Sequence, residues 1–304
     1  MGENTKIEWA THTLNLWIGC EAISPACDHC YAAAYAKRVG RDFSQRTRTL
    51  STTWSKALKY QAQAAAFFLE HGHRQRIFVN SLSDFFDNEA PQQWRQDFFE
   101  LARLTPDLDY LLLTKRIGNA PRMLPEDWGN GYPNVWIGAT VPNQPEADRD
   151  IPKLLRVRAA IRFLSVEPML GPLSFVGRWV NHPNPALHEN WLEALDWVIA
   201  GGESGPEARP THPEWIRQLR DQCIAIGTPF LMKQWGEWMP VSQMSDGEQD
   251  RDEVRRRSTT VLQLDGVEEF AFPPGAMTLY RMGKAYSGRK LDGRTWDEFP
   301  KVSQ

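Results

Sequence analysis

Short apolar runs alternate with longer segments of helical periodicity along most of the chain. The runs are rich in β-branched or aromatic residues and have the length of buried strands. Seven of them are predicted as strands, at residues 14–18, 76–79, 110–113, 135–137, 161–164, 197–200 and 230–232. Continuous apolar strands of this kind are typical of a sheet that is covered on both faces.

The segments between these runs carry helix signals. The clearest begins at Pro213, a favourable first-turn residue, and ends at Gly227. Pro91 opens another predicted helix, and residues 145–155 repeat its apolar spacing. In residues 55–69 the predicted buried stripe is Leu58, Ala62, Ala65 and Leu69.

This alternation predicts an α/β fold built on a parallel sheet with helical crossovers. A (β/α) barrel, partial or open, is the economical arrangement for that many strands, and a doubly wound open sheet is the alternative. The predicted barrel covers residues 1–236. Residues 237–304 are predicted to form a charged loop at 242–258 and a small β appendage with strands at 260–264 and 277–280.

Composition indicates a globular protein without a membrane segment. The chain has 304 residues, is 41% hydrophobic, and contains no uninterrupted apolar run of membrane-spanning length. Its early charged residues do not form a secretion signal, so a cytoplasmic location is expected. The net charge of -3 excludes a global positive field for nucleic acid. A local basic cluster remains, which is either a nucleic-acid patch or a solvated loop: Arg38, Arg41, Arg46 and Arg48.

Three of the four cysteines are crowded into one short segment. Cys20, Cys27 and Cys30 have the spacing C-x6-C-x2-C, which favours a metal site over a disulfide framework. Thiolates prefer soft metals, and three of them can hold a [4Fe-4S] cluster that keeps one iron open. Zinc is the alternative, with His29 or His12 as the fourth ligand. Cys223 is predicted to be a core residue on its helix.

Polar residues follow almost every predicted strand. In a (β/α) barrel such positions face one cavity, which would here contain the cluster. The simpler interpretation of each is a helix cap, a solvated strand exit or, for Gly201–Glu203, a tight turn. The residues include Asn80, Ser81, Ser83, Asp84, Thr114, Lys115, Arg116, Thr140, Asn143, Ser165, Glu167, Gly201, Gly202, Glu203, Ser204, Lys233, Gln234 and Trp235.

With these motifs in view, the sequence resembles a family of phage- and prophage-associated three-cysteine proteins. That family is distantly similar to radical S-adenosylmethionine enzymes such as spore photoproduct lyase. The first cysteine gap has six residues here, where three are usual in the superfamily. The matching segments lie at residues 6–9, 19–32, 79–84, 113–116, 163–168, 201–205, 233–236 and 291–296.

The resemblance implies a barrel of the radical S-adenosylmethionine type with a [4Fe-4S] cluster on Cys20, Cys27 and Cys30. It implies reductive cleavage of S-adenosylmethionine, an electron donor, and a nucleotide or DNA base as the substrate for modification or repair. The catalytic candidates are Asp84, Lys115, Arg116 and Lys233. The cofactor contacts expected from it are Tyr31, Ser81, Thr114, Ser165, Glu167, Gly201, Gly202, Glu203 and Gln234.

Two other functions are kept open. One is a zinc-binding barrel with a hydrolytic or structural role. The other is a non-enzymatic iron–sulfur partner protein in a phage or host-defence setting. Iron and zinc content, together with turnover of S-adenosylmethionine, would separate the three hypotheses. The sequence does not determine the oligomeric state.

Overall fold

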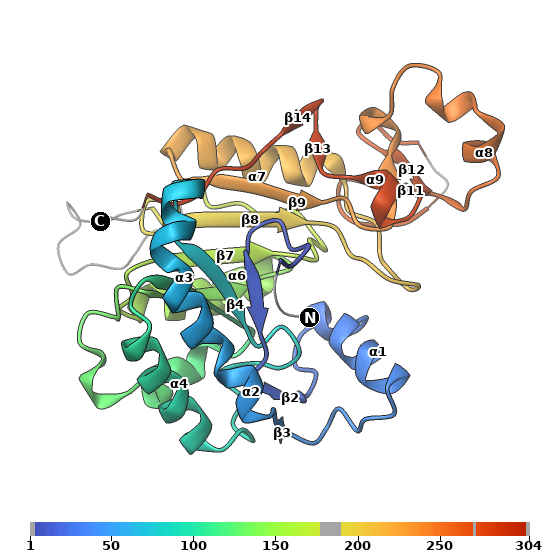
Figure 1. Ribbon diagram of the computed structural model, residues 1–304. Helices are drawn as coiled ribbons and strands as arrows, with labels where there is room; N and C mark the ends of the chain where they lie inside the picture. Colours follow the sequence, from blue (N-terminus) through green and yellow to red (C-terminus); the bar gives the residue numbers. More distant parts are fainter. Residues whose placement is uncertain (1–3, 177–189, 270–271, 302–304) are drawn as a thin grey trace. The chain divides into compact units, whose positions relative to one another are not determined.

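A computed structural model describes residues 4–176, 190–269 and 272–301. Its main feature is a seven-stranded sheet in the order β1-β4-β5-β6-β7-β8-β9 (Figure 1). Neighbouring strands pair in parallel, as in β1–β4, β4–β5, β5–β6 and β8–β9. The strands are His12–Leu14, Gln75–Val79, Leu108–Thr114, Val135–Thr140, Arg162–Val166, Trp197–Gly201 and Phe230–Gln234.

The strand order distinguishes between the two predicted arrangements. A doubly wound sheet reverses its order at a switch point, whereas these strands follow one another from edge to edge as the chain runs. Sequential order is the topology of a (β/α) barrel, and with β1 and β9 as the two edges the sheet is an open one. The predicted α/β fold class is therefore confirmed in its open form.

Six of the seven predicted strands coincide with observed strands, but the prediction for residues 14–18 was wrong. Strand β1 ends at Leu14, and Trp17–Ile18 forms a separate strand, β2, that pairs antiparallel with Thr47–Arg48 (β3). The chain leaves the sheet because the amide of Leu16 donates to Asn80 Oδ1 at 2.8 Å instead of to a neighbouring strand. Cys20 consequently follows β2 and not a strand of the main sheet.

Helices connect the strands and pack on the sheet within each part of the chain. α3 contacts β4 and β5, and α7 contacts β8 and β9. α7 begins at Pro213 and is capped by Gly227 in the left-handed conformation, as the sequence predicts. The helices are Tyr31–Arg38 (α1), Ser51–Trp54 (α2), Lys56–His71 (α3), Gln92–Leu104 (α4), Ala120–Met123 (α5), Gln144–Arg156 (α6), Pro213–Ile226 (α7), Asp252–Arg255 (α8) and Lys284–Ser287 (α9).

The buried face of α3 differs from the predicted stripe. All four predicted residues are exposed, Leu69 to 86%. The buried residues are instead Ala57, Tyr60 and Ala64, on a different face of the helix. An alanine-rich helix presents similar apolar character on several faces, and the His12 ring stacked on Tyr60 at 4.1 Å decides which face packs inward.

The C-terminal part contains small antiparallel sheets, as predicted. Trp238–Pro240 (β10), Thr259–Leu262 (β11) and Met277–Arg281 (β12) form one, and Lys290–Leu291 (β13) with Arg294–Thr295 (β14) form another. The charged loop is anchored within this region because Val254 is fully buried against Met239 and Met282.

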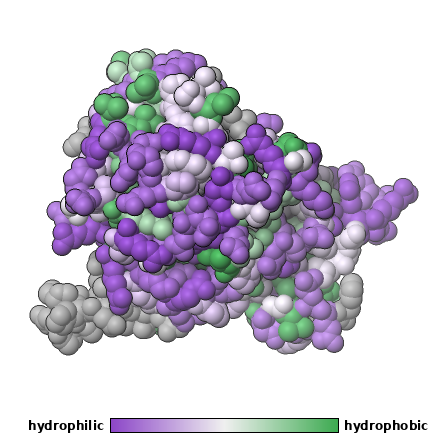
Figure 2. Space-filling view, turned by 90° about the horizontal axis from the view of Figure 1, so that it is seen from below, coloured by the Kyte–Doolittle hydropathy of each residue, from purple (hydrophilic) through white to green (hydrophobic). Residues whose placement is uncertain are grey.

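The chain divides into two compact units. Unit 1 comprises residues 1–139 and 152–163, and unit 2 comprises residues 140–151 and 164–304. No helix in the described ranges combines the length and apolar composition needed to cross a membrane. The face shown in Figure 2 is mainly hydrophilic, with apolar residues in small separate patches.

Candidate functional site

The three cysteines of unit 1 lie on the loop between β2 and α1. Ser24 opens a short 3-10 helix, Pro25–Cys27, by accepting a hydrogen bond from the Ala26 amide at 3.1 Å. The Cys30 amide then donates to the Cys27 carbonyl at 3.2 Å, and Cys30 is the N-cap residue of α1. The predicted single turn between Cys27 and Cys30 is thus present, and all three cysteines are free and partly exposed.

Gly19 allows Cys20 to reach its position in this loop. Its φ is +112°, and a Cβ atom would lie 2.2 Å from the carbonyl oxygen of Gln45. The Cys20 amide donates to the Phe43 carbonyl at 2.9 Å, which joins the cysteine to the same neighbouring segment. Only glycine tolerates both the conformation and this close backbone approach.

The thiol set suits a soft metal by its chemistry, although the loop is not a closed metal site. Within residues 4–176, 190–269 and 272–301, no group of three or more His, Cys, Asp or Glu side chains is placed to hold a metal ion. His12, predicted as one candidate for a fourth zinc ligand, has both ring nitrogens engaged, with Gln75 Oε1 and the Asn4 amide. The three partly exposed thiols remain as donors for a soft metal or a cluster that keeps one iron open.

Arg116 connects the cysteine loop to the carboxyl ends of β4 and β5. Its Nη1 donates to Cys20 Sγ at 3.4 Å, and its Nη2 donates to the carbonyl of Glu21 at 2.8 Å. The guanidinium also lies 3.5 Å from Asp84 Oδ2, with only 9% of the Arg116 side chain exposed. Of the four catalytic candidates, the structure therefore brings Arg116 and Asp84 to a cysteine.

The Asp84 carboxylate is fully engaged by its own surroundings. Oδ1 accepts hydrogen bonds from Thr114 Oγ1 at 2.6 Å and the Phe86 amide at 3.0 Å, and Oδ2 accepts one from the Lys115 amide at 2.9 Å. Asp84 thus caps its own turn, as the simpler interpretation predicts, and also orients Arg116. Thr114 and Lys115 contribute to this network through one hydroxyl and one amide.

The electrostatics of Cys20 reflect these neighbours. Burial and then the charge of Asp84 raise the pKa of the Cys20 thiol, whereas Arg116 lowers it by charge and hydrogen bonding. The same contacts raise the pKa of Arg116 against the opposing effect of its burial. Arg116 is thus the cation that favours a thiolate at this position.

Tyr31 and Ser81 form a second contact between the cysteine loop and the end of β4. The Tyr31 hydroxyl donates to the Ser81 carbonyl at 2.5 Å, while the Ser81 side chain bonds with Asn15. Asn15 was not predicted, although its side chain also accepts the Leu82 amide at 2.9 Å. A polar residue inside an apolar run was the available signal.

Two arginines of the predicted basic cluster form ion pairs within unit 1. Arg46 is an almost buried partner of Asp87, with Nη2 2.7 Å from Oδ2, and Arg48 lies 2.6 Å from Asp97. Arg48 also stacks over Trp54 at 4.3 Å. These two arginines are therefore neither a free nucleic-acid patch nor merely solvated.

In unit 2, Glu167 is the centre of a polar group at the ends of β7 and β9. Lys233 Nζ lies 2.8 Å from both carboxylate oxygens of Glu167, and Gln234 Nε2 donates to Oε1 at 2.6 Å. Gln234 also bonds to Ser204 Oγ at 2.9 Å. The structure thus joins three of the predicted residues with the loop that follows β8.

Two buried polar oxygen atoms in the described part of unit 2 lack a hydrogen-bond partner. Within the described part of the chain, Gln234 Oε1 and Thr140 Oγ1 have no hydrogen-bond partner. An unsatisfied buried polar atom costs about 1–3 kcal/mol, so a bound donor at either atom would be favoured. Ser165, also predicted, is buried on β7 in the same unit.

The Gly201–Gly202–Glu203 segment is packed against the chain itself. A Cβ atom on Gly202 would lie 2.0 Å from the Trp235 carbonyl oxygen, so the close approach at this glycine is made by the protein backbone. The Glu203 carboxylate is held by Arg209, whose Nε lies 2.9 Å from Oε2 and whose Nη2 lies 2.7 Å from Oε1. Arg209 was missed because it does not follow a strand.

The predicted site residues thus form two groups, one in each unit. Unit 1 holds the cysteines with Tyr31, Ser81, Asp84 and Arg116, and unit 2 holds Glu167, Lys233, Gln234 and their neighbours. That all of them face one cavity stays a prediction. The metal and cofactor roles of the individual residues stay predictions as well.

The fold and the site define a class of protein, an α/β protein with an open parallel sheet and a three-cysteine loop. The chain belongs to the family described as Protein of unknown function (DUF5131), whose model matches residues 4–300. No curated protein matches the chain in sequence. The association with phages that the sequence resemblance implied stays a prediction.

Solved structures of spore photoproduct lyase are similar in fold. A mutant with bound AdoMet and dinucleoside spore photoproduct has a TM-score of 0.45 and 12% identity, covering 92% of this chain and 71% of that one. The lyase complexed with dinucleoside spore photoproduct has a TM-score of 0.41 and 11% identity, with the same coverage. These values describe a distant likeness of fold.

Proposed function

We propose that this protein is an iron–sulfur enzyme of the radical S-adenosylmethionine type that acts on a nucleotide or a DNA base. The observation that supports it most directly is the cysteine loop, in which Arg116 Nη1 donates a hydrogen bond to Cys20 Sγ at 3.4 Å. Cys20, Cys27 and Cys30 would hold a [4Fe-4S] cluster. Such a cluster, when bound by three thiolates, supplies an electron for cleavage of S-adenosylmethionine at its open iron.

The residues of the chain have separate tasks in this proposal. Arg116 offsets negative charge at the cysteines, and Asp84 keeps its guanidinium oriented. Within unit 2, Lys233 holds the Glu167 carboxylate in place, and Gln234 Oε1 is the buried acceptor that a ligand donor could satisfy. An external electron donor completes the set of partners.

The four free cysteines also fit the cytoplasmic location that we propose. Thiols remain reduced in the cytosol, whereas chains in oxidising compartments usually pair them. A cluster with an open iron needs the same protection from oxidants. The location and the cofactor are therefore proposed together.

Anaerobic reconstitution with iron and sulfide tests the proposal. The expected result is a brown protein with about four irons per chain that forms 5'-deoxyadenosine from S-adenosylmethionine under reducing conditions. Cys27→Ser should lose the colour and the product. Cys223→Ala is the control and should keep both, because Cys223 is a core residue of α7 outside the three-cysteine segment and alanine adds no polar group there.

The other hypotheses give different results in the same experiment. A colourless protein that retains one tightly bound zinc would contradict the proposal and favour the zinc-binding barrel. A stable cluster without 5'-deoxyadenosine would favour the non-enzymatic iron–sulfur partner. Metal analysis and product chromatography distinguish these outcomes.

A further inference from the structure

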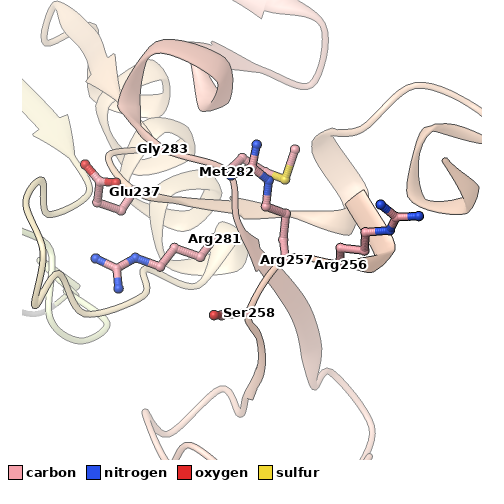
Figure 3. Close-up of a pocket in the computed structure, with 7 residues that line it drawn as sticks. All are labelled: Glu237, Arg256, Arg257, Ser258, Arg281, Met282 and Gly283. Carbon is pink, nitrogen blue, oxygen red and sulfur yellow. The ribbon is translucent and has the colours of Figure 1, made fainter. Parts of the chain in front are cut away.

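Unit 2 contains an open pocket in its C-terminal antiparallel region. The pocket has a volume of about 360 Å³ and is bordered by residues 256–258, by the end of β12 and by Glu237 (Figure 3). Its walls are joined by backbone hydrogen bonds, from Arg281 to the Ser258 carbonyl at 2.9 Å and from Gly283 to the Glu237 carbonyl at 3.0 Å. The pocket is therefore formed by paired segments and not by side chains alone.

The charge of this pocket is positive. Arg256, Arg257 and Arg281 line it together with a single carboxylate, that of Glu237. Within the described residues, the guanidinium groups of Arg256 and Arg257 make no hydrogen bond or ion pair, whereas the neighbouring Arg255 lies 3.0 Å from Asp250. Two cations at the pocket thus lack the partner that the adjacent arginine has.

The side chains differ in their direction. In Figure 3, Arg257 extends toward Met282 and Gly283, Arg281 extends toward the side of Glu237, and Arg256 points away from both. Arg281 Nη2 donates to the Gly205 carbonyl at 3.0 Å and also to the Pro206 carbonyl, which fixes this arginine in place. Arg257 is accordingly the arginine that is available to a ligand.

We infer that this pocket binds a phosphate group of a nucleotide, either free or within an oligonucleotide. Guanidinium groups bind phosphate oxygens through paired, charge-assisted hydrogen bonds, and the Ser258 hydroxyl adds a further donor. The volume exceeds what one phosphate occupies and is within the usual range of small-ligand pockets, about 300–1,000 Å³. Glu237 then provides an acceptor for a sugar hydroxyl or a base amino group.

The position of Arg281 links the pocket to the loop after β8. That loop contains Gly205, whose amide donates to Glu237 Oε1 at 3.2 Å and whose carbonyl accepts from Arg281. Arg281 thus joins the pocket wall to the segment that follows Glu203. The inference itself does not depend on an iron–sulfur cluster.

Titration calorimetry on the full-length protein, with and without reconstitution, tests the inference. The probes are inorganic phosphate, a deoxynucleoside 5'-monophosphate and a short single-stranded oligodeoxynucleotide. Arg257→Ala should weaken nucleotide binding about 10-fold or more, because a charge-assisted contact is lost. Arg257→Lys should recover part of the loss. Arg255→Ala, which makes the same change of charge outside the pocket, should bind as the wild type does.

The arms of the experiment also separate the two sources of phosphate. Binding of the monophosphate at least as tightly as of the oligonucleotide assigns the pocket to a terminal phosphate, and tighter binding of the oligonucleotide assigns it to a backbone phosphate. Absence of binding for every probe would overturn the inference. Equal losses in Arg255→Ala and Arg257→Ala would also overturn it, since they indicate a diffuse charge effect. A cluster-free protein that still binds the nucleotide separates this result from failure of the proposed function.

Discussion

Buried polar contacts fix the positions of several charged side chains in this protein. Asp84 and Arg116 in unit 1, and Glu203 and Arg209 in unit 2, each form a charged pair whose carboxylate is almost completely buried. Removing one partner of such a pair is costly because the other charge remains buried without compensation. Sequence patterns identify Asp84, Arg116 and Glu203, whereas the structure adds Arg209 and shows which residues pair.

Asp109 gives a pH-dependent prediction at this scale. Burial raises its pKa to about 6 from an ordinary value of 3.8, against the opposing effect of Arg74 and Arg76. The folded protein therefore binds this proton more tightly than the unfolded chain does. This contribution to stability is fully present below about pH 4, falls as the pH rises to about 6, and then levels off.

We expect Asp109→Asn to remove this fall in stability between pH 4 and pH 6. The difference in unfolding free energy between variant and wild type should change by up to about 3 kcal/mol across this window, from 1.36 kcal/mol per pKa unit. Urea unfolding at several pH values measures it. A difference that is constant from pH 4 to pH 7 would show that Asp109 titrates normally in the folded protein.

At the scale of elements, helix α3 shows how packing selects a face. Its predicted stripe is exposed, and its buried positions are Ala57, Tyr60 and Ala64. The ring of Tyr60 is stacked on His12, whose Nε2 lies 2.9 Å from Gln75 Oε1. The contact is made by a polar aromatic residue, which a purely apolar stripe does not include.

Two substitutions on α3 test this register. Tyr60→Ala should lower the unfolding free energy by about 3–5 kcal/mol, because it removes a fully buried aromatic side chain. Leu58→Lys should change it by less than about 0.5 kcal/mol, since Leu58 is 49% exposed. Chemical denaturation of both variants is the measurement. A larger loss of stability in Leu58→Lys than in Tyr60→Ala would show that the face predicted from the sequence is the buried one.

At the scale of the whole chain, the last segment completes unit 2. The amide of Met232 on β9 donates to the Trp296 carbonyl at 3.0 Å, and the Glu298 amide donates to the Phe230 carbonyl at 3.2 Å. Trp197 Nε1 on β8 also donates to the Glu298 carbonyl at 2.8 Å. These residues cover an edge of the sheet that would otherwise present unpaired backbone groups.

A chain that ends at Ser287 should therefore be less stable and more prone to association than the full chain. Its denaturation midpoint should fall, and its elution in size-exclusion chromatography should shift toward larger species. Lys290→Ala in the full chain is the control and should behave as the wild type, because Lys290 is exposed and the change leaves the backbone hydrogen bonds in place. A truncated chain with unchanged midpoint and elution would show that the segment after Ser287 does not stabilise unit 2.

The sequence by itself determined the elements and the kind of chemistry. Buried parallel strands are continuous apolar runs, so six of them were placed correctly, and the helix of residues 213–226 was bounded by proline and glycine. The three cysteines were visible because their spacing is local. Such features depend on residues near one another in the chain.

Only the tertiary structure decided the contacts between distant residues. Arg116 reaches Cys20 across 96 positions, and Lys233 reaches Glu167 across 66. The break of the first predicted strand at Asn15 was set by residues that follow β4, Asn80 to Leu82. The inward face of α3 was set by His12 on β1 and Gln75 on β4. Local pattern cannot specify these pairs, because their geometry follows from how the strands assemble.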